Sequence, residues 1–323
     1  MQTKPILIVG SMAFDDLEFP VPVASPDVRS AAESDPRATT SFKDVVGGSA
    51  TYSALAASAF APVRVVAVVG RDFPEATLET LRSRRIDTAG IERADGLTFR
   101  WKGRYHADLV NRDTLDTQLN VFANFRPRLA SGYGDSPLVL LGNIHPELQL
   151  EVLEQTTKPE LVVADTMNFW ITGEPKTLAK LIARIDLLII NDEEARLLSG
   201  IHNLARAAKE ILSRGPKGLI IKRGEHGSLF FDKDGVFAAP ALLLEHVVDP
   251  TGAGDSFAGG LLGYLAEQGK YDHHTMRRAM MHGTAAASYC VEAVGTLGLS
   301  ELSRENIRQR VERIRHLTHV GEE

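Results

Sequence analysis

Six short apolar runs limit the folds open to this chain more than any other feature of its sequence. Each is rich in Val, Ile and Leu, and most end in Gly, Asn or Asp, as do strands that are buried on both faces. The runs are ILIVG (6–10), VRVVAVVG (63–70), LVLLGNI (138–144), LVVAD (161–165), LLIIND (187–192) and LIIKRG (219–224). Helix-patterned segments alternate with them, at 49–60, 74–85, 146–155, 176–184, 192–199 and 203–213. The alternation predicts an α/β fold with a mostly parallel sheet between two helix layers.

Two segments interrupt this alternation and predict a small β-rich lid beside the main sheet. Residues 98–122 alternate with period two, whereas 15–42 begins and ends like a strand and is rich in Pro, Ser and Ala in between. We expect the lid to be built from about 15–45 and 97–123, with residues 24–40 as a mobile loop. Because no repeat or domain boundary is visible, residues 1–323 are expected to form a single domain.

Charge and composition exclude several classes of function. The net charge of −6 and the pI near 6.0 argue against binding to nucleic acid or to an anionic membrane. The apolar runs are too short to cross a bilayer, and the N-terminus does not resemble a signal peptide. Cys290, the single cysteine, lies in an alanine-rich segment and is expected to be a small buried residue. We therefore expect a cytoplasmic protein.

The stretch DPTGAGDSFAGGLLG (249–263) contains five glycines where an apolar helix begins. Each glycine costs a helix roughly 0.5–1 kcal/mol relative to alanine, so either close backbone packing or a ligand on the main chain must compensate. The dinucleotide fingerprint G-x-G-x-x-G is absent, because Phe257 occupies its last glycine position. A P-loop is absent as well, because leucine follows Gly260.

The start of this helix has the properties of a phosphate site. If the helix begins near Gly254, the amides of Gly252, Ala253 and Gly254 have no intrahelical acceptor and form an anion hole. Asp255 then lies beside that hole, where a carboxylate is unfavourable unless it has a chemical role. Phosphoryl transfer requires both a base and fixed donors. The alternative is that Asp255 is only a helix cap and that the glycines serve helix packing.

Five motifs together identify a family. They are DPTGAGDSFAGG, the paired glycine of VVGGSATYSALAAS (45–58), the N-x-x-E pair Asn191 and Glu194, VGSMAFD at the first strand, and the glycine turn IKRGEHGS. In sequence and in order they resemble the signatures of the ribokinase/PfkB family of carbohydrate and nucleoside kinases, and the resemblance covers essentially the whole chain. It implies a three-layer α/β/α ribokinase-like fold and an ATP-dependent kinase that phosphorylates a hydroxyl of a small sugar or nucleoside.

The resemblance also implies a role for each matching residue. Asp255 would take the proton of the attacking hydroxyl, and the amides of Gly252, Ala253 and Gly254 would form the anion hole. ATP and Mg²⁺ would be the cofactors, with Asn191 and Glu194 holding magnesium through water. The residues expected to line the nucleotide site are Lys222, Gly224, Gly227 and Thr251. Asp249 resembles a position that helps to hold a monovalent cation such as K⁺ in many members. Whether this chain binds such a cation is left open at this point.

The acceptor is expected to face Asp15, Gly47, Gly48, Tyr52 and Asn143. Adjacent Asp16 competes with Asp15 but would point to the opposite side of a strand. Asn143 could instead stabilise its own turn. Ala13 and Tyr52 replace two asparagines of ribokinase itself, which disfavours free ribose, and the ring of Tyr52 could stack on a base or simply pack.

The lid leaves the acceptor class open. Its alternation places Phe99, Trp101 and Tyr105 on one face and Arg100, Lys102 and Arg104 on the other. An aromatic face over the pocket would favour a nucleoside base, and a basic face would favour a sugar phosphate. A third possibility is that the aromatic residues pack against the lid of a second copy in a homodimer. Three other functions also remain open on this scaffold: a non-catalytic ligand-binding regulator, an ADP-dependent kinase, and a kinase of a vitamin-like heterocyclic alcohol.

Overall fold

A nine-stranded sheet forms the centre of the molecule. The structure is a computed structural model that describes residues 3–20 and 39–319. The strands lie in the order β13 (Gly235–Ala239), β12 (Ser228–Asp232), β11 (Gly218–Lys222), β10 (Leu187–Asn191), β9 (Leu161–Asp165), β8 (Leu138–Leu141), β1 (Ile6–Val9), β4 (Val63–Val69) and β5 (Ile86–Arg93). Neighbours from β11 to β5 are parallel, whereas β12 and β13 add an antiparallel edge. All six predicted strands are present, and the prediction of a mostly parallel sheet is confirmed.

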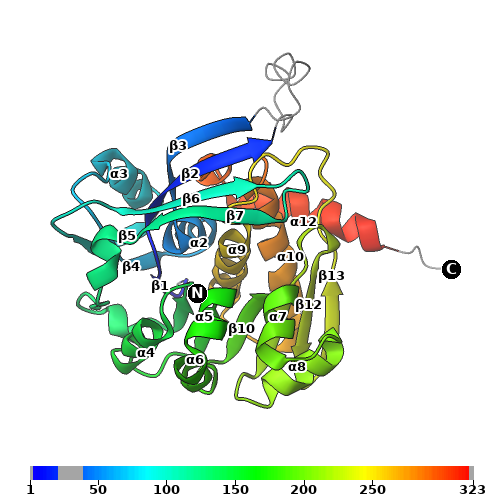
Figure 1. Cartoon of the computed structure of the whole chain (residues 1–323). Coiled ribbons are helices and arrows are strands. Elements are labelled where there is room, and N and C mark those ends of the chain that lie inside the picture. Colours follow the sequence, from blue (N-terminus) through cyan, green and yellow to red (C-terminus); the bar gives the residue numbers. More distant parts are fainter. Residues whose placement is uncertain (1–2, 21–38, 320–323) are drawn as a thin grey trace.

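Two helix layers cover the sheet (Figure 1). One layer holds α2 (Ser49–Ser58), α3 (Glu75–Ser83), α9 (Ala253–Gln268), α10 (His273–Cys290) and α12 (Arg304–Thr318). The other holds α4 (Pro146–Glu154), α5 (Asn168–Gly173), α6 (Pro175–Ile182), α7 (Asp192–Ser199) and α8 (Leu204–Leu212). Successive residues of β1 alternate between the two cores, with Ile6 and Ile8 in the first and Leu7 and Val9 in the second. This alternation explains why the strand is apolar at every position.

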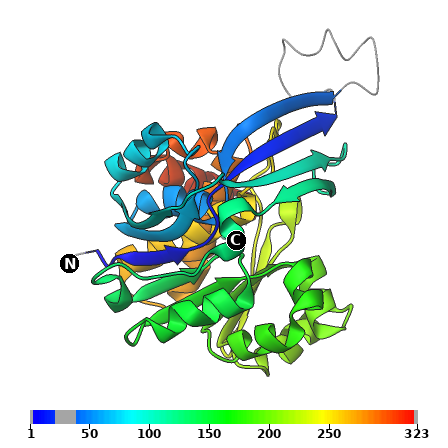
Figure 2. The same cartoon turned by 60° about the vertical axis from the view of Figure 1, so that its left-hand side comes forward.

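A second sheet forms the predicted lid. Its order is β3 (Thr39–Gly47), β2 (Ala13–Pro20), β6 (Phe99–Tyr105) and β7 (Arg112–Gln118). Figure 2 shows these strands standing away from the main sheet. A small core of Leu17, Phe19 and Tyr105 holds the lid together. Residues 24–38 of the predicted loop lie outside the described residues, whereas Thr39 and Thr40 begin β3, so the loop prediction was wrong for these two residues.

The glycines of the 249–263 stretch divide into two groups. A Cβ on Gly259 would lie 2.2 Å from the carbonyl oxygen of Ser53 in α2, and one on Gly263 would lie 2.9 Å from the carbonyl oxygen of Ala57. On the other side of α9, a Cβ on Gly260 would lie 2.7 Å from the side chain of Ala286 in α10. These three glycines therefore serve close helix packing. Gly252 and Gly254 belong to the site described below.

No helix among residues 3–20 and 39–319 combines the length and the apolar character that a membrane crossing requires. Cys290 is fully buried, as expected, and its thiol donates to the carbonyl oxygen of Thr251 across 3.3 Å.

Candidate active site

The carboxyl ends of three neighbouring parallel strands bring together residues that are far apart in the sequence. Asn191 ends β10 and pairs in register with Lys222, which ends β11. On the other side of β10, Ile189 pairs with Asp165, the last residue of β9. Because parallel strands share one carboxyl edge, the polar ends of these strands lie together, where α/β proteins usually bind ligands.

The N-terminus of α9 provides an anion site. Gly252 is the N-cap residue with φ 74°, a left-handed conformation that favours glycine, and the helix begins at Ala253. Within the described part of the chain, the amides of Gly252 and Gly254 have no hydrogen-bond acceptor. The amide of Ala253 instead donates to the carbonyl oxygen of Pro250 across 3.2 Å, so two of the three expected amides are free. Free amides at the positive end of a helix attract an anion.

Asp255 lies in the first turn of α9, as expected, and is half-buried. Its pKa is raised to about 7, first by burial and then by the carboxylate of Asp165, whereas Lys222 and then Arg112 offset part of this rise. A carboxyl group with a pKa near 7 gains and loses a proton near neutral pH, which suits a general base.

Asn191 and Glu194 form the capping box of α7. The side chain of Asn191 accepts from the amide of Glu194 across 2.7 Å, and Glu194 Oε2 accepts from the amide of Asn191 across 2.7 Å. Burial first, and then the carboxylate of Asp165, raises the pKa of Glu194 to about 7, although Lys222 acts in the opposite direction. The pair therefore has a structural role, and one carboxylate oxygen of Glu194 is left over for another partner.

The acceptor side is organised around Asp15. This side chain is buried, and burial followed by the carboxylates of Asp249, Asp255 and Asp16 raises its pKa to about 8. A Cβ on Gly47 would lie 2.0 Å from Asp15 Oδ2, so glycine is needed for the carboxyl group to fit. Asp16 points to the other side of the strand and accepts from the amide of Asp44, as the alternation predicts.

Tyr52 packs beneath the anion site. A Cβ on Gly252 would lie 2.4 Å from atoms of the Tyr52 ring, and the side chain is 1% exposed. The ring therefore packs, which is one of the two expected roles, and neither face is open to stack on a base. Its hydroxyl is buried without a hydrogen-bond partner in the described part of the chain.

Gly48, with φ 94°, is the N-cap residue of α2, and a Cβ there would lie 2.5 Å from the carbonyl oxygen of Ser11.

Asp249 links two loops. Its Oδ1 accepts from the amide of Thr251 and its Oδ2 from the amide of Gly295, each across 2.8 Å. Both oxygens thus have protein partners, and a monovalent cation at this residue stays a prediction.

Asn143 follows β8 and makes a contact that the sequence did not indicate. Its Oδ1 accepts from the indole Nε1 of Trp170 across 3.0 Å, which leaves the amide donors of Asn143 for another partner. Asn143 therefore bonds to α5 rather than to its own turn.

Gly224 and Gly227 form the turn between β11 and β12. They have φ 53° and 81°, and the amide of Arg223 donates to the carbonyl oxygen of Gly227 across 2.8 Å. The turn is as expected, whereas its contact with a nucleotide stays a prediction.

The lid presents its aromatic face to the main domain. The hydroxyl of Tyr105 lies 2.8 Å from Thr251 Oγ1, and the Tyr105 ring stacks on Phe19 with centroids 5.3 Å apart. On the other face, Lys102 and Arg104 form ion pairs with Glu18 at 2.9 and 2.7 Å. The basic face therefore does not cover the site.

Two charged residues of the site were not predicted from the sequence. Asp165 forms an ion pair with Lys222, with Oδ2 and Nζ 3.2 Å apart. The polar end of the LVVAD run was the available signal, since ligands gather at strand ends. Arg112 begins the lid strand β7 opposite Tyr105, and its charge lowers the pKa of both Asp255 and Glu194. No pattern in the sequence marked it.

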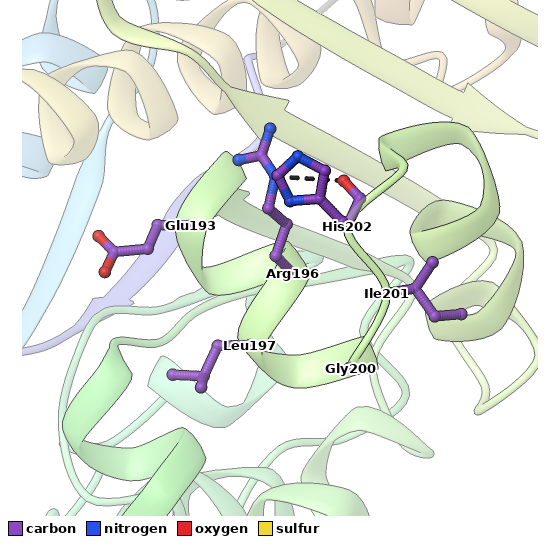
Figure 3. A pocket seen from close by; sticks show the side chains of 6 residues that line it. All are labelled: Glu193, Arg196, Leu197, Gly200, Ile201 and His202. Atoms are coloured by element: carbon purple, nitrogen blue, oxygen red, sulfur yellow. Dashed lines mark hydrogen bonds between the residues drawn. The ribbon is translucent and has the colours of Figure 1, made fainter.

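The molecule also has a hollow of about 410 Å³ beside α7, which Figure 3 shows. Arg196, its one arginine, donates to the carbonyl oxygen of His202 across 3.2 Å and is paired with Asp192. None of its six lining residues is a predicted site residue.

The chain is similar in sequence to known carbohydrate and nucleoside kinases. Residues 136–301 match the pfkB family carbohydrate kinases. A cytidine kinase of Thermococcus kodakarensis is 30% identical over 263 residues, which cover 80% of this chain and 87% of that protein.

Two solved structures share the fold. A Burkholderia thailandensis nucleoside kinase in complex with inosine has a TM-score of 0.74 at 22% identity, covering 95% of this chain and 97% of that one. An Arabidopsis thaliana ribokinase complexed with ribose and ATP has a TM-score of 0.72 at 21% identity, covering 96% of this chain and 99% of that one.

Proposed function

Because this chain belongs to the pfkB family of carbohydrate kinases and is a sugar or nucleoside kinase, we propose that it transfers the γ-phosphoryl group of ATP to a hydroxyl of a nucleoside. The observation that carries the proposal is the meeting of free amides, a carboxyl group with a pKa of about 7 and a lysine at the start of α9. ATP as the donor is supported by the ribokinase complex of the same fold.

Asp255 acts as the base in this reaction. The hydroxyl oxygen of the acceptor forms a bond to the γ-phosphorus, and its proton passes to the carboxylate of Asp255. The bond between the γ-phosphorus and the oxygen bridging it to the β-phosphate breaks, and its electron pair leaves with ADP. The amides of Gly252 and Gly254 donate to the oxygens of the transferred group, where charge is concentrated.

The residues present fit a magnesium ion held mostly through water. Asn191 and Glu194 each use one oxygen for the capping box, and Glu194 keeps one buried carboxylate oxygen, a ligand type that magnesium prefers. Among the described residues no three acidic, histidine or cysteine side chains are arranged to hold a metal directly. When bound, magnesium would neutralise part of the phosphate charge.

The lid supports a nucleoside acceptor. Tyr105 contacts Thr251 before α9 and Trp101 packs in the same lid cluster, while Lys102 and Arg104 of the opposite face are paired with Glu18. Aromatic surface suits a heterocyclic base, whereas the basic groups of the opposite face, which would suit an acceptor phosphate, are already paired. Asp15, protonated near neutral pH, can both donate to and accept from sugar hydroxyls. The cytidine kinase relative agrees with this class.

The proposal is tested by measuring ADP release from ATP and magnesium with nucleosides, free sugars and sugar phosphates, using Asp255→Asn as the blank. We expect release with nucleosides that the blank lacks. Release with sugar phosphates alone would contradict the nucleoside assignment. If ATP binds but no acceptor causes ADP release, a ligand-binding regulator would be favoured instead. Phosphoryl transfer with ADP as the donor would overturn the assignment of ATP as the donor.

A further inference from the structure

Lys222 extends from the end of β11 across the end of β10 to Asp165 on β9. Its Nζ lies 3.2 Å from Asp165 Oδ2, and the two side chains are only 20% and 10% exposed. A buried ion pair of this kind contributes little net stability, because removing two charges from water cancels most of their attraction. Stability alone therefore does not explain why lysine stands here among the strand ends.

The ammonium group also lies against the start of α9. A Cβ on Gly254 would be 2.7 Å from Nζ, so glycine leaves the space that Lys222 fills. A cation is unfavourable at the positive end of a helix unless an anion joins the two. Asp165 supplies one carboxylate from the end of β9, and Asp255 supplies another from the first turn of α9. An oxyanion bound at the Gly254 amide would lie beside the ammonium, because Nζ fills the space that a Gly254 Cβ would take.

The surrounding charges favour this reading. Burial lowers the pKa of Lys222, but Asp165, Glu194 and Asp255 outweigh burial and hold that pKa above its ordinary value. The lysine therefore remains charged at the pH of catalysis. The 3.2 Å contact with Asp165 and the space filled beside Gly254 place the ammonium at the start of α9 rather than at the glycine turn that follows β11.

We propose that Lys222 is a catalytic residue whose ammonium donates hydrogen bonds to the oxygens of the transferred phosphoryl group, and that Asp165 is the positioning residue that aims it. This inference rests on the proposed kinase function and goes beyond a lining role in the nucleotide site. The phosphoryl group moves from the bridging oxygen of ATP, which leaves with ADP, to the acceptor oxygen, while its own oxygens stay on the ammonium and the α9 amides. The proton of the acceptor still goes to Asp255, and Lys222 neither gains nor loses one.

The first test separates turnover from binding. In Lys222→Met we expect kcat to fall about 10²–10³-fold, as on loss of a donor to a developing oxyanion, with KM for the acceptor changed less than about 3-fold. Asp165→Asn leaves the ammonium of Lys222 in place but removes the carboxylate that orients it, and we expect kcat to fall about 10-fold or more. The matched control is Lys217→Met at the opposite end of β11, which breaks the exposed 2.7 Å pair with Asp186 and should leave kcat unchanged.

The second test needs no turnover. ADP with aluminium fluoride imitates the phosphoryl group in transfer, and calorimetry would compare its affinity with that of ADP alone. We expect the fluoride to tighten ADP binding in the wild type but not in Lys222→Met. If that variant does not fold, the double variant Lys222→Met/Asp165→Asn removes both charges and serves instead.

The outcomes are distinguishable. If the wild type turns over and Lys222→Met keeps its kcat, the role of Lys222 is overturned but the kinase proposal stands. The same holds if aluminium fluoride still tightens ADP binding in Lys222→Met. A raised KM for ATP with kcat unchanged would return Lys222 to a nucleotide-lining role and also overturns it. A wild-type chain that transfers no phosphate to any acceptor overturns the kinase proposal and this inference together.

Discussion

The hydroxyl of Tyr105 on the lid lies 2.8 Å from Thr251 Oγ1 in the loop before α9. This hydrogen bond joins the lid sheet to the main domain at the point where the anion site begins. It couples the position of the lid to the loop that presents the free amides.

Removing the link should weaken acceptor binding. We expect Tyr105→Phe to raise KM for the acceptor about 2- to 10-fold with little change in kcat, the range for one lost hydrogen bond. Steady-state kinetics at saturating ATP would measure it. The control is Tyr133→Phe, since the Tyr133 hydroxyl makes a 3.2 Å bond to the carbonyl oxygen of Asp87, away from the site. Equal effects of the two substitutions would show that the lid link has no special role.

The rate of transfer should depend on the ionisation of Asp255. With a pKa of about 7, the carboxyl group is the active base only when deprotonated, so kcat should rise as pH increases through 7 and then level off. Asp255→Asn should lower kcat about 10²–10⁴-fold and abolish this rise. A pH–rate profile would test both points, with exposed Asp234→Asn as the control. A rise that persists in Asp255→Asn would assign the base to another group.

The free energy of unfolding should depend on pH through Asp15. Burial first, and then neighbouring carboxylates, raises its pKa from 3.8 to about 8, so the folded chain holds this proton more tightly than the unfolded chain does. The contribution of Asp15 to the free energy of unfolding therefore falls as pH rises between those values, and the full cost is present above about pH 8.

Asp15→Asn removes this ionisation. In denaturant unfolding, the free energy of unfolding of the variant relative to that of the wild type should increase by at most about 1.4 kcal/mol per pH unit from pH 6 to 8. The variant should bind the acceptor more weakly at every pH. Parallel stability curves for the two proteins would contradict the raised pKa.

Two glycines in left-handed conformations should differ in their tolerance of alanine. Gly252→Ala would place a Cβ 2.4 Å from the Tyr52 ring at φ 74°, whereas at Gly269, with φ 63°, a Cβ would meet nothing within 4 Å. Gly269→Ala should therefore cost only the backbone strain, about 1 kcal/mol, with activity retained. Gly252→Ala should cost several times more and abolish transfer. Melting temperatures and ADP release would measure the difference, and similar losses for both would show that strain alone acts at Gly252.

Local sequence predicted the elements of this fold well. The six apolar strands, their carboxyl ends and the helix start near Gly254 follow from short-range patterns, because burial on both faces and left-handed turns restrict the residue types that can occur there. The N-x-x-E pair was also visible, although only the structure showed that Asn191 and Glu194 cap α7.

Other features depend on residues distant in the sequence, and only the folded chain decides them. Lys222 meets Asp165 because parallel strands share one edge, although 57 residues separate them. The inward face of the lid depends on how the lid packs on the main domain, and the burial of Tyr52 under Gly252 depends on how α2 packs against the start of α9. The raised pKa values of Asp15 and Asp255 arise from burial and from carboxylates on other elements. The sequence by itself thus determined the strands, the helices and the family motifs, whereas tertiary packing decided the electrostatics of the site, because charges and desolvation act through space and not along the chain.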